Sequence, residues 1–339
     1  MSLRPGPRNL ITDVDGLAVG NAEDARVRSG VTVVLPERRT VASADVRGGA
    51  PGTRETELLA PASMMDAVDG IVLSGGSAYG LDAATGAMLW LAERGRGFRL
   101  GQRIIPIVPS AILYDLENGG DKDWSKGLPY QALAQAACGA AGAAFALGTA
   151  GAGYGAKAGP LKGGLGSASA VDEDGLQVGA LVAVNARGGV TLGEQPQFWA
   201  WPLEQGDEFG GLPPPAQRVA LDQPRRAAAL AGNTTLAVVA TNVRLSKAEA
   251  QRVTIMAQDG LARAIRPLHT PSDGDSVFAL STATLDPEGE RGSLVECIGA
   301  TAADCLTRAV ARGVYLATSL PGMAPSWRDR FAQVVGRAV

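Results

Sequence analysis

Residues 228–245 read AALAGNTTLAVVATNVRL, and the interpretation of the whole chain depends on this stretch. The run that begins at Thr234 is rich in valine, alanine and threonine, which is typical of a buried β-strand. The residues directly before it, Gly232 and Asn233, are small and flexible. Such an approach can be an ordinary turn before a strand. It can also be a peptide bond that the protein itself cuts.

Other strand-like and helix-like stretches lie along the chain. Runs rich in valine, isoleucine and threonine, bounded by glycine or proline, predict strands at 29–36, 40–46, 70–76, 103–116, 176–186, 234–243 and 276–285. Helices are expected at 77–95, 246–265 and 293–318. The second helix opens with Ser246 and carries Glu249 three residues later, which is a capping box. The mixture predicts an α/β (α+β) chain built from layers of helix on sheet.

Size and composition limit the possible classes of protein. The chain has 339 residues, and 46% of them are hydrophobic, which is enough for a full core. The formal net charge of -3 gives no basic field for nucleic acid or for an anionic membrane. The N-terminal sequence lacks an apolar signal segment, and no apolar run reaches the roughly 20 residues of a membrane span. We therefore expect a cytoplasmic protein with no nucleic-acid or membrane partner.

The histidine and cysteine counts narrow the chemistry. His269 is the only histidine, so a cluster of histidine metal ligands is excluded, and any Ser–His–Asp triad would have to use it. Cys138, Cys297 and Cys305 lack the spacing of metal ligands and lie in alanine-rich, helix-like stretches. We expect the cysteines to be buried small residues and the catalytic base of any enzyme to be a group other than histidine.

Two glycine-rich stretches and one long connection interrupt these patterns. The Gly75–Gly76 turn could cradle a phosphate at a helix start, but it matches no phosphate motif, and close packing is the simpler interpretation. The run 151–169 supplies little core volume, so its backbone is expected to approach another element closely. Residues 195–233 are interpreted as a long surface connection that a protease or the protein itself could cut.

Several polar side chains occupy positions where chemistry is possible. Asp273 and Asp275 flank a glycine just before a strand, where they form either a solvated turn or a carboxylate pair at the strand mouth. Asn185 ends another strand, either as a turn residue or as a hydrogen-bond donor to an oxyanion. Lys157 and Lys162 lie in the second glycine-rich run, either solvated or as cations that help keep a neighbouring amine neutral.

Thr234 needs a base if its hydroxyl is to act as a nucleophile. In a chain with one histidine, the simplest base is the residue's own α-amine, whose unperturbed pKa of roughly 7.7–8 leaves a useful neutral fraction. That amine exists only if the bond between Asn233 and Thr234 is broken. In the intact chain the same hydroxyl can attack the preceding carbonyl and form an ester that water opens.

Together these motifs resemble a known family. The pattern NTTLAVVATNVRLS (233–246), a helix, and then LHTPSDGDSVFALST (268–282) is similar to the 6-aminohexanoate-oligomer (nylon-oligomer) endohydrolases. These belong with the aminopeptidase–D-esterases and the β-aminopeptidases. Further motifs that fit are DVRGGAPGTRET (45–56), LSGGSAYGLDAATG (73–86), PSAILYDL (109–116) and VNARG (184–188). The resemblance covers most of the chain.

The resemblance implies a self-cleaving hydrolase with an N-terminal nucleophile and an αββα sandwich. The cut would fall between Asn233 and Thr234. It would give an α subunit of residues 1–233 and a β subunit of residues 234–339, which stay together as one hydrolase domain. A homo-oligomer, either a dimer or a tetramer of αβ units, is implied as well. The nucleophile would be Thr234.

The resemblance also implies roles for the surrounding residues. Asn185 matches an asparagine beside the nucleophile, Asp273 and Asp275 match an acidic pair, and Tyr114 matches a tyrosine at the substrate cleft. The position equivalent to the family's catalytic lysine is Pro160, with a lysine on either side. We favour Lys162, because LKGGLGS recurs in the wider family, and Lys157 is the alternative. The aminopeptidase–esterase branch has a serine nucleophile, with Ser and Glu at the acidic positions, so this chain is nearer the nylon-hydrolase branch.

The sequence therefore predicts an amide hydrolase that acts on linear amide oligomers, such as 6-aminohexanoate oligomers, or on peptides. Thr234 Oγ attacks the amide, its α-amine takes the proton, and Asn185 stabilises the oxyanion. Asp273 and Asp275 orient the nucleophile and, with Lys162, tune its amine. No metal or organic cofactor is required. One alternative is an aminopeptidase or D-esterase acting on short peptides or β-peptides, which should hold a free amine with a buried carboxylate. Another is a non-catalytic ligand-binding protein that uses the Gly-Gly turn.

Overall fold

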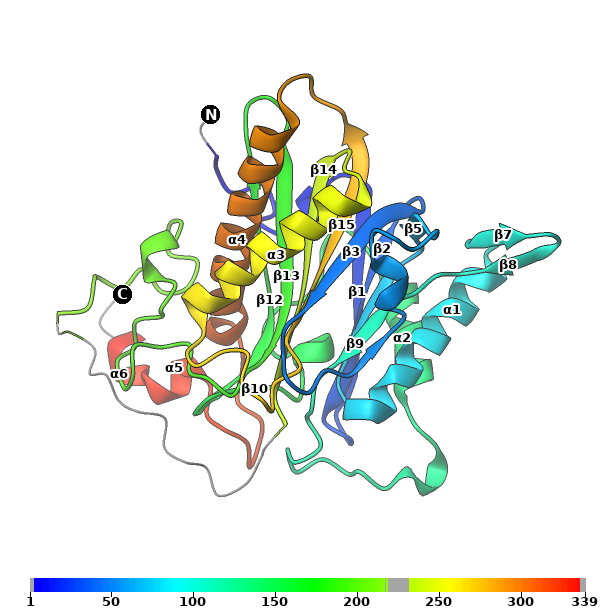
Figure 1. The fold of residues 1–339 in the computed structure, drawn as a ribbon. Helices are drawn as coiled ribbons and strands as arrows, with labels where there is room; N and C mark the ends of the chain where they lie inside the picture. The colour runs from blue at the N-terminus through cyan, green and yellow to red at the C-terminus, as the bar shows by residue number, and fades with distance from the viewer. Residues whose placement is uncertain (1–2, 217, 219–231, 336–339) are drawn as a thin grey trace.

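Two β-sheets packed face to face form the centre of the molecule, and a pair of helices covers the outer face of each sheet (Figure 1). The computed structural model describes residues 3–216, 218 and 232–335. The order of layers is helices, sheet, sheet, helices. The layered αββα sandwich expected from the sequence is confirmed.

The six-stranded sheet carries the strand that begins at Thr234. Its order is β12 (Gly164–Val171), β13 (Gln177–Asn185), β14 (Thr234–Val243), β15 (Ser276–Leu285), β3 (Thr40–Val46) and β5 (Ala67–Val68). β14 runs parallel to β15 and antiparallel to β13. Because β14 is hydrogen-bonded on both sides, a cut at its first residue would leave the strand held in the sheet.

The second sheet has five strands. Its order is β1 (Leu17–Asp24), β2 (Ser29–Pro36), β6 (Ile71–Ser74), β9 (Ser110–Ile112) and β4 (Thr53–Arg54). Two short hairpins pair separately from the two large sheets: β7 (Phe98–Leu100) with β8 (Arg103–Ile105), and β10 (Lys157–Ala158) with β11 (Leu161–Lys162).

The helices divide between the two sheets. α3 (Lys247–Ala264) and α4 (Arg291–Tyr315) cover the six-stranded sheet, whereas α1 (Ala83–Glu93) and α2 (Tyr130–Gly139) cover the five-stranded one; α5 (Trp327–Arg330) and α6 (Ala332–Val335) follow α4. Short 3-10 helices are η1 (Ile11–Asp13), η2 (Glu57–Leu59), η3 (Ser77–Asp82), η4 (Trp124–Lys126), η5 (Gly151–Gly153) and η6 (Trp201–Leu203). The capping box of Ser246 and Glu249 starts α3 as expected. In the part of the chain that the structure describes, no helix is long and apolar enough to cross a membrane.

The apolar core has three layers, and β14 contributes to two of them. Leu236 and Val238 point into the layer between the two sheets. Ala237 and Val239 point into the layer between the six-stranded sheet and its helices. Since successive side chains of a strand point to opposite faces, a strand covered on both faces is apolar on both, as the central run LAVVA (236–240) of β14 is.

Most of the expected strands are present. The strands at 29–36, 40–46, 234–243 and 276–285 have the bounds of β2, β3, β14 and β15. The run 103–116 is divided into β8 and β9, with Pro106 and Pro109 between them. Proline has no N–H group to donate to a strand pairing, which explains the break.

The glycine-rich run 151–169 includes β12, which lies against α4. A Cβ atom at Gly166 would be 1.9 Å from the Ala309 carbonyl oxygen, and one at Gly164 would be 2.2 Å from the Gly313 carbonyl oxygen. The expected close approach of the backbone is confirmed, and the element that it approaches is a helix.

Residues 195–216 differ from the long surface connection that the sequence suggested. Phe198 and Phe209 are buried, and Phe198 stacks on Trp327 with ring centroids 5.6 Å apart. These aromatic side chains complete the core beside α5, so the expectation is wrong for this half of the segment. The remainder, residue 217 and residues 219–231, lies outside the described residues.

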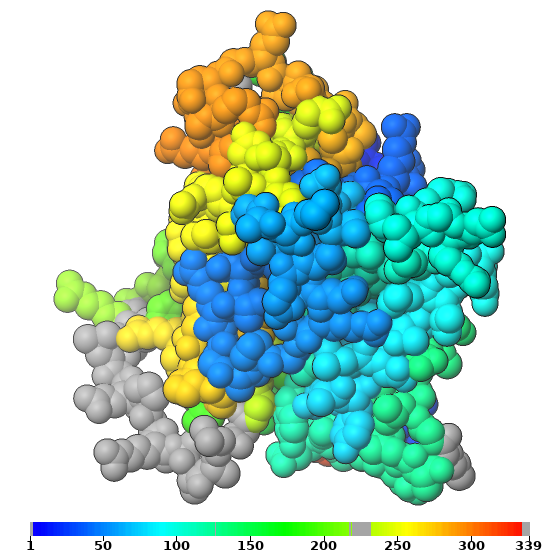
Figure 2. Space-filling model, turned by 45° about the vertical axis from the view of Figure 1, so that its right-hand side comes forward, coloured from blue at the N-terminus to red at the C-terminus, as the bar shows by residue number. Residues whose placement is uncertain are grey.

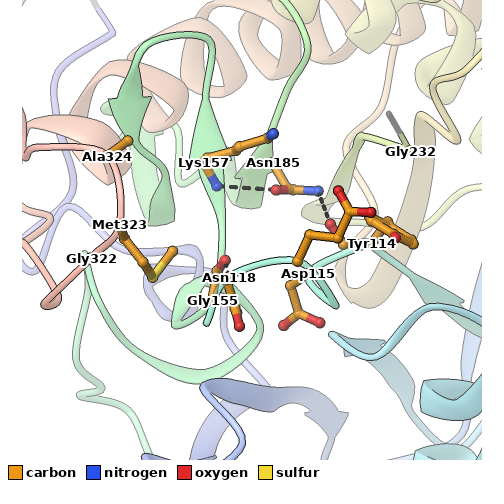
Figure 3. Close-up of a pocket in the computed structure, with 11 residues that line it drawn as sticks. Tyr114, Asp115, Asn118, Gly155, Lys157, Asn185, Gly232, Gly322, Met323 and Ala324 are labelled. Atoms are coloured by element: carbon orange, nitrogen blue, oxygen red, sulfur yellow. Dashed lines mark hydrogen bonds between the residues drawn. The ribbon is translucent and has the colours of Figure 1, made fainter. Parts of the chain in front are cut away.

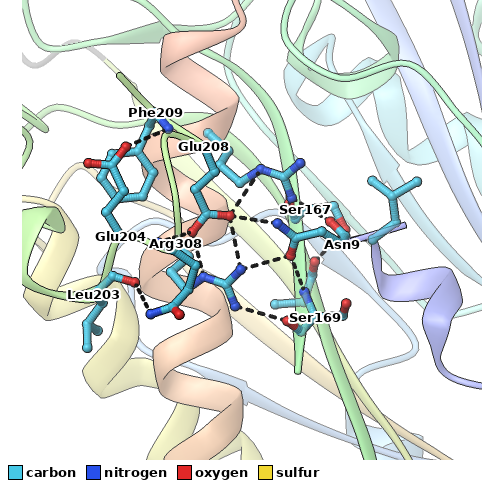
Figure 4. Close-up of polar contacts among 12 residues, drawn as sticks. Asn9, Ser167, Ser169, Leu203, Glu204, Glu208, Phe209 and Arg308 are labelled. Carbon is cyan, nitrogen blue, oxygen red and sulfur yellow. Dashed lines mark hydrogen bonds and ion pairs between the residues drawn. The ribbon is translucent and has the colours of Figure 1, made fainter. Parts of the chain in front are cut away.

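A buried ion cluster joins α4 to the N-terminal half of the chain (Figure 4). Arg308 Nε lies 2.6 Å from Glu208 Oε1, and the two side chains are 5% and 7% exposed. Arg308 also donates to Asn9 Oδ1 at 2.9 Å and to the Ser169 carbonyl oxygen at 2.9 Å. These contacts connect residues on either side of the Asn233–Thr234 bond.

Candidate active site

The Asn233–Thr234 peptide bond lies where β14 begins. Thr234 is 4% exposed and is paired in register with Asn185 at the end of β13. On the other side, Asn233 forms a parallel bridge with Asp273 in the loop that leads into β15. Residues from two neighbouring strand ends therefore flank this bond.

Hydrogen bonds fix both the carbonyl and the hydroxyl at this bond. The Thr234 hydroxyl donates to the Asn233 carbonyl oxygen, with 2.5 Å between the oxygens. The Gly274 N–H donates to the same carbonyl oxygen at 3.0 Å. A Cβ atom at Gly274 would lie 2.7 Å from Thr234 Oγ1, so only glycine leaves room for the hydroxyl.

The acidic pair that the sequence suggested lies beside this bond. Asp273 and Asp275 are 2% and 1% exposed. Asp275 Oδ1 accepts the Thr235 N–H at 2.7 Å, and Asp273 Oδ2 accepts the Thr270 N–H at 2.8 Å. Burial, reinforced by the negative charge of Asp275, raises the pKa of Asp273. Asp273 Oδ1 is buried and accepts no hydrogen bond within the described part of the chain.

The backbone of the glycine-rich loop after β3 donates hydrogen bonds to the loop that carries Asp273 and Asp275. Ala50 N–H donates to the Asp273 carbonyl oxygen at 2.8 Å, and Arg47 N–H donates to the Asp275 carbonyl oxygen at 3.0 Å. A Cβ atom at Gly48 would lie 2.3 Å from the Asp275 nitrogen. Figure 2 shows the chain near residue 50, in blue, covering the surface between the yellow α3 and the cyan α1. The paired glycines of DVRGGAPG are explained by this contact.

Asn185 is held by backbone groups on both sides (Figure 3). Its Oδ1 accepts the Lys157 N–H at 3.0 Å, and its Nδ2 donates to the Tyr114 carbonyl oxygen at 2.9 Å. The side chain is 1% exposed. Since an amide nitrogen carries two hydrogens, one N–H is engaged here, and the second, which has no acceptor among the described residues, can serve a bound group.

A cleft of about 140 Å³ lies beside Asn185 and Gly232 (Figure 3). Its walls include Tyr114, Asp115 and Glu117. Burial and the neighbouring charge of Glu117 raise the pKa of Tyr114. The cleft ends at the residue that precedes the Asn233–Thr234 pair, so a substrate bound there would lie next to this bond.

Asp115 is a buried carboxylate at this cleft, and the sequence did not single it out. It is 3% exposed, and its Oδ1 accepts the Gly76 N–H at 2.7 Å. Among the described residues its Oδ2 accepts no hydrogen bond of good geometry, although the Ser29 hydroxyl lies close to it. Burial raises the pKa of Asp115, against the opposing charge of Lys122. The Gly75–Gly76 turn is closely packed, as expected: its N–H is occupied and the Tyr130 ring covers it.

The two candidate lysines lie in different surroundings. Lys162 is fully buried, and its Nζ donates to the carbonyl oxygens of Gly153 at 3.0 Å and Gly163 at 2.9 Å. Burial lowers its pKa to about 7, against the opposing effect of the Asp115 charge. Lys157 is exposed and lines the cleft, whereas Lys162 does not. The structure thus places the favoured lysine behind the cleft wall and the alternative in it.

The structure brings Thr234, Asn185, Asp273, Asp275 and Tyr114 together at one end of the two central strands. It adds three residues to which sequence reasoning gave no role in the site: Gly274 at the carbonyl of Asn233, His269 at Asp275, and Asp115 at the cleft. The arrangement can polarise a carbonyl, hold a hydroxyl against it and accommodate a new positive charge. In the described part of the chain there is no cluster of three metal-ligating side chains.

Solved structures share this architecture. The β-aminopeptidase of a Burkholderia species superposes with a TM-score of 0.72 at 21% identity, covering 99% of this chain and 96% of that chain. The L-aminopeptidase D-Ala-esterase/amidase of Ochrobactrum anthropi, described as a variant of the Ntn hydrolase fold, gives a TM-score of 0.72 at 20% identity, covering 100% and 96%. At these identities the likeness establishes the fold.

The fold is shared with these aminopeptidases, and the family match makes the chain a peptidase, an enzyme that hydrolyses amide bonds. The chain belongs to Peptidase family S58, whose model matches residues 9–326. A protein named uncharacterized aminopeptidase in Mycobacterium tuberculosis is 45% identical over 97% of this chain and 99% of its own length. A 6-aminohexanoate-oligomer endohydrolase from a Kocuria species is 30% identical over 90% of this chain and 86% of its own length. Membership in a peptidase family favours the hydrolase over the non-catalytic alternative.

Proposed function

We propose that this hydrolase matures by cutting its own Asn233–Thr234 bond and then uses Thr234 as its nucleophile. The observation that carries the proposal is the pair of hydrogen bonds on the Asn233 carbonyl oxygen. The Thr234 hydroxyl donates at 2.5 Å and the Gly274 N–H at 3.0 Å. The attacking group and a donor for the developing oxyanion both lie at the bond that must break.

Maturation proceeds through an ester. Thr234 Oγ attacks the Asn233 carbonyl carbon and loses its proton, while the carbonyl oxygen becomes an oxyanion facing the Gly274 N–H. When the carbon–nitrogen bond breaks, the nitrogen takes a proton and becomes the α-amine of Thr234. Water then opens the ester, which leaves Asn233 with a terminal carboxylate and restores the hydroxyl. The products are residues 1–233 and 234–339, still joined by the pairing of β14 with β13 and of β15 with β3.

Turnover repeats this chemistry on a substrate amide. The neutral α-amine of Thr234 accepts the hydroxyl proton and passes it to the leaving amine, and water releases the acyl group. The free N–H of Asn185 serves the substrate oxyanion. Asp273 Oδ1, buried without a hydrogen bond among the described residues, accepts the new ammonium. Asp273 stabilises the charged form of the Thr234 α-amine, and the positive charge of the buried Lys162 opposes this and favours the neutral form. Lys157 is the alternative cation, and it lies in the cleft.

The hydroxyl at Thr234 is the first element to test. Thr234→Ala should leave a single band on a denaturing gel and no amidase activity, whereas Thr234→Ser should mature slowly and retain measurable turnover. A Thr234→Ala variant that still yields two fragments would exclude this bond chemistry.

The substrate class that we propose is linear amide oligomers, including 6-aminohexanoate oligomers, and peptides. The 30% identical endohydrolase supports this class. The oligomeric state, a dimer or tetramer of αβ units, and the cytoplasmic location are part of the same proposal. Light scattering after size-exclusion chromatography measures the first, and cell fractionation the second.

Aminopeptidase action on short peptides is the second candidate, and Asp115 favours it. An aminopeptidase must neutralise the substrate ammonium, and a buried carboxylate with an unbonded oxygen at the cleft provides the charge. The 45% identical relative carries the name aminopeptidase. Comparing a free tripeptide with its N-acetylated form separates the candidates. A preference for the free amine that Asp115→Asn abolishes supports the aminopeptidase, and equal rates support the endohydrolase.

A further inference from the structure

The only histidine of the chain contacts the acidic pair. His269 lies in the loop between α3 and β15, and its ring Nδ1 is 2.9 Å from Asp275 Oδ2. The backbone N–H of His269 donates to the same oxygen at 3.1 Å. One residue therefore supplies two hydrogen bonds to one carboxylate oxygen.

Asp275 also contacts β14, the strand that begins with Thr234. The other oxygen of Asp275, Oδ1, accepts the N–H of Thr235 at 2.7 Å. Thr235 is fully buried and directly follows Thr234. The carboxylate thus has one oxygen on the histidine and one on the start of β14. Its orientation fixes where the first residues of β14 lie.

The backbone of His269 explains the double contact but does not account for the choice of histidine. Its φ of 53° lies in the left-handed region, which glycine adopts most readily and which asparagine, aspartate and histidine adopt more often than other residues. The turn brings N–H and ring to the same oxygen. Because glycine, asparagine or aspartate would suit this backbone equally, the ring contact is the feature that distinguishes histidine here.

The partner of the ring sets its tautomer. A carboxylate accepts hydrogen bonds, so Nδ1 must carry the hydrogen and Nε2 is left as the acceptor in the neutral ring. The side chain is 23% exposed. No bond between His269 and the Thr234 hydroxyl is present, since that hydroxyl donates to the Asn233 carbonyl oxygen.

We infer that His269 is a positioning residue: it clamps Asp275 so that this carboxylate holds the start of β14, with the Thr234 hydroxyl against the carbonyl that it attacks. The histidine neither gives nor takes a proton in the reaction. It acts through Asp275, in maturation and in turnover alike. The inference rests on the proposed role of Thr234.

Two substitutions test the clamp by activity. His269→Ala removes the ring donor, and we expect maturation and kcat to fall about 10- to 100-fold, because small displacements of reacting groups cost that much, while KM stays within about twofold. His269→Asn keeps a side-chain N–H and tolerates the left-handed backbone, so it should recover most of the rate. Equal rates in wild type and His269→Ala would overturn the inference, as would a His269→Asn variant as slow as His269→Ala.

A spectroscopic measurement tests the clamp without any catalysis. In the Thr234→Ala precursor, labelled with ¹⁵N-histidine and freed of any tag, all ¹⁵N imidazole signals come from His269. We expect the Nδ1–H tautomer, with Nδ1–H protected from exchange, at mildly alkaline pH. The Nε2–H tautomer would overturn the inference even if the wild-type chain cleaves itself. Conversely, an uncut wild-type chain with the Nδ1–H tautomer would refute the role of Thr234 and leave the contact to Asp275 intact.

Discussion

Gly274→Ala is the substitution that examines the geometry of the self-cleaving bond most closely. The added Cβ would lie 2.7 Å from Thr234 Oγ1 and 3.0 Å from the Ala50 carbonyl oxygen. Both distances are shorter than ordinary contacts between carbon and oxygen, so the hydroxyl must move by several tenths of an ångström or rotate away. Displacements approaching 1 Å can cost about 100-fold in rate, which corresponds to about 2.7 kcal/mol in activation free energy. Maturation should slow by up to about that factor.

The assay is a time course of the two fragments on a denaturing gel after synthesis of the precursor. Overpacking also lowers the free energy of unfolding, by roughly 1–3 kcal/mol, so thermal unfolding is measured in parallel. Gly139→Ala is the matched control, because nothing lies within 4 Å of a Cβ atom at that position. Maturation of Gly274→Ala at the wild-type rate would refute the reasoning, since the hydroxyl would then not need the space that glycine leaves.

Three further outcomes are expected. Asn185→Ala should lower kcat by about 100- to 1,000-fold in steady-state assays, the usual cost of losing an oxyanion donor, and a loss below tenfold would contradict that role. Lys162→Met removes a buried amine whose pKa is lowered to about 7. In the unfolded chain this lysine keeps its proton up to roughly pH 10.4, so between about pH 7 and pH 10.4 the unfolded state binds more protons than the folded state. The free energy of unfolding of the wild type, relative to that of the variant, should therefore rise with pH by up to about 1.4 kcal/mol per pH unit. If urea titrations gave the same difference between wild type and variant at every pH in this range, they would contradict the lowered pKa. Arg308→Met leaves the buried Glu208 with Arg312, at 3.6 Å, as its remaining charged partner and should cost up to about 3–5 kcal/mol in thermal unfolding, whereas Arg263→Met, at a pair about half exposed on both sides, should cost less than about 1 kcal/mol.

Much of the fold could be predicted because the central strands are covered on both faces. β14 and β15 contain the buried apolar runs LAVVA (236–240) and VFAL (277–280), and their bounds agree with the sequence prediction. β1 was not foreseen, because only the first half of LAVGNAED is apolar and its second half is small, polar and partly exposed. β12 was not foreseen as a strand because its glycines, which suggest a loop, are required by the approach of α4.

The part of the site that depends on residues close together in the sequence could be predicted. Asp273 and Asp275 stand two residues apart before a strand, and Thr234 begins the neighbouring one, so the parallel pairing of β14 and β15 brings them together. The distinction between Lys157 and Lys162 was not predictable. The two are paired on one short hairpin, and only distant parts of the chain, such as Pro325, which accepts the Lys162 N–H, determine which one is buried. The contact of His269 with Asp275 depends on the left-handed backbone conformation of His269, which the surrounding sequence does not predict.

Intact mass spectrometry of the purified wild-type protein, with Edman sequencing of the smaller species, examines the role of Thr234 most directly. The account predicts two polypeptides of 233 and 106 residues (339 − 233 = 106), with the smaller beginning TTLAVVAT. A single uncut chain with full amide turnover would contradict it, because Thr234 would then have no free amine to accept the proton.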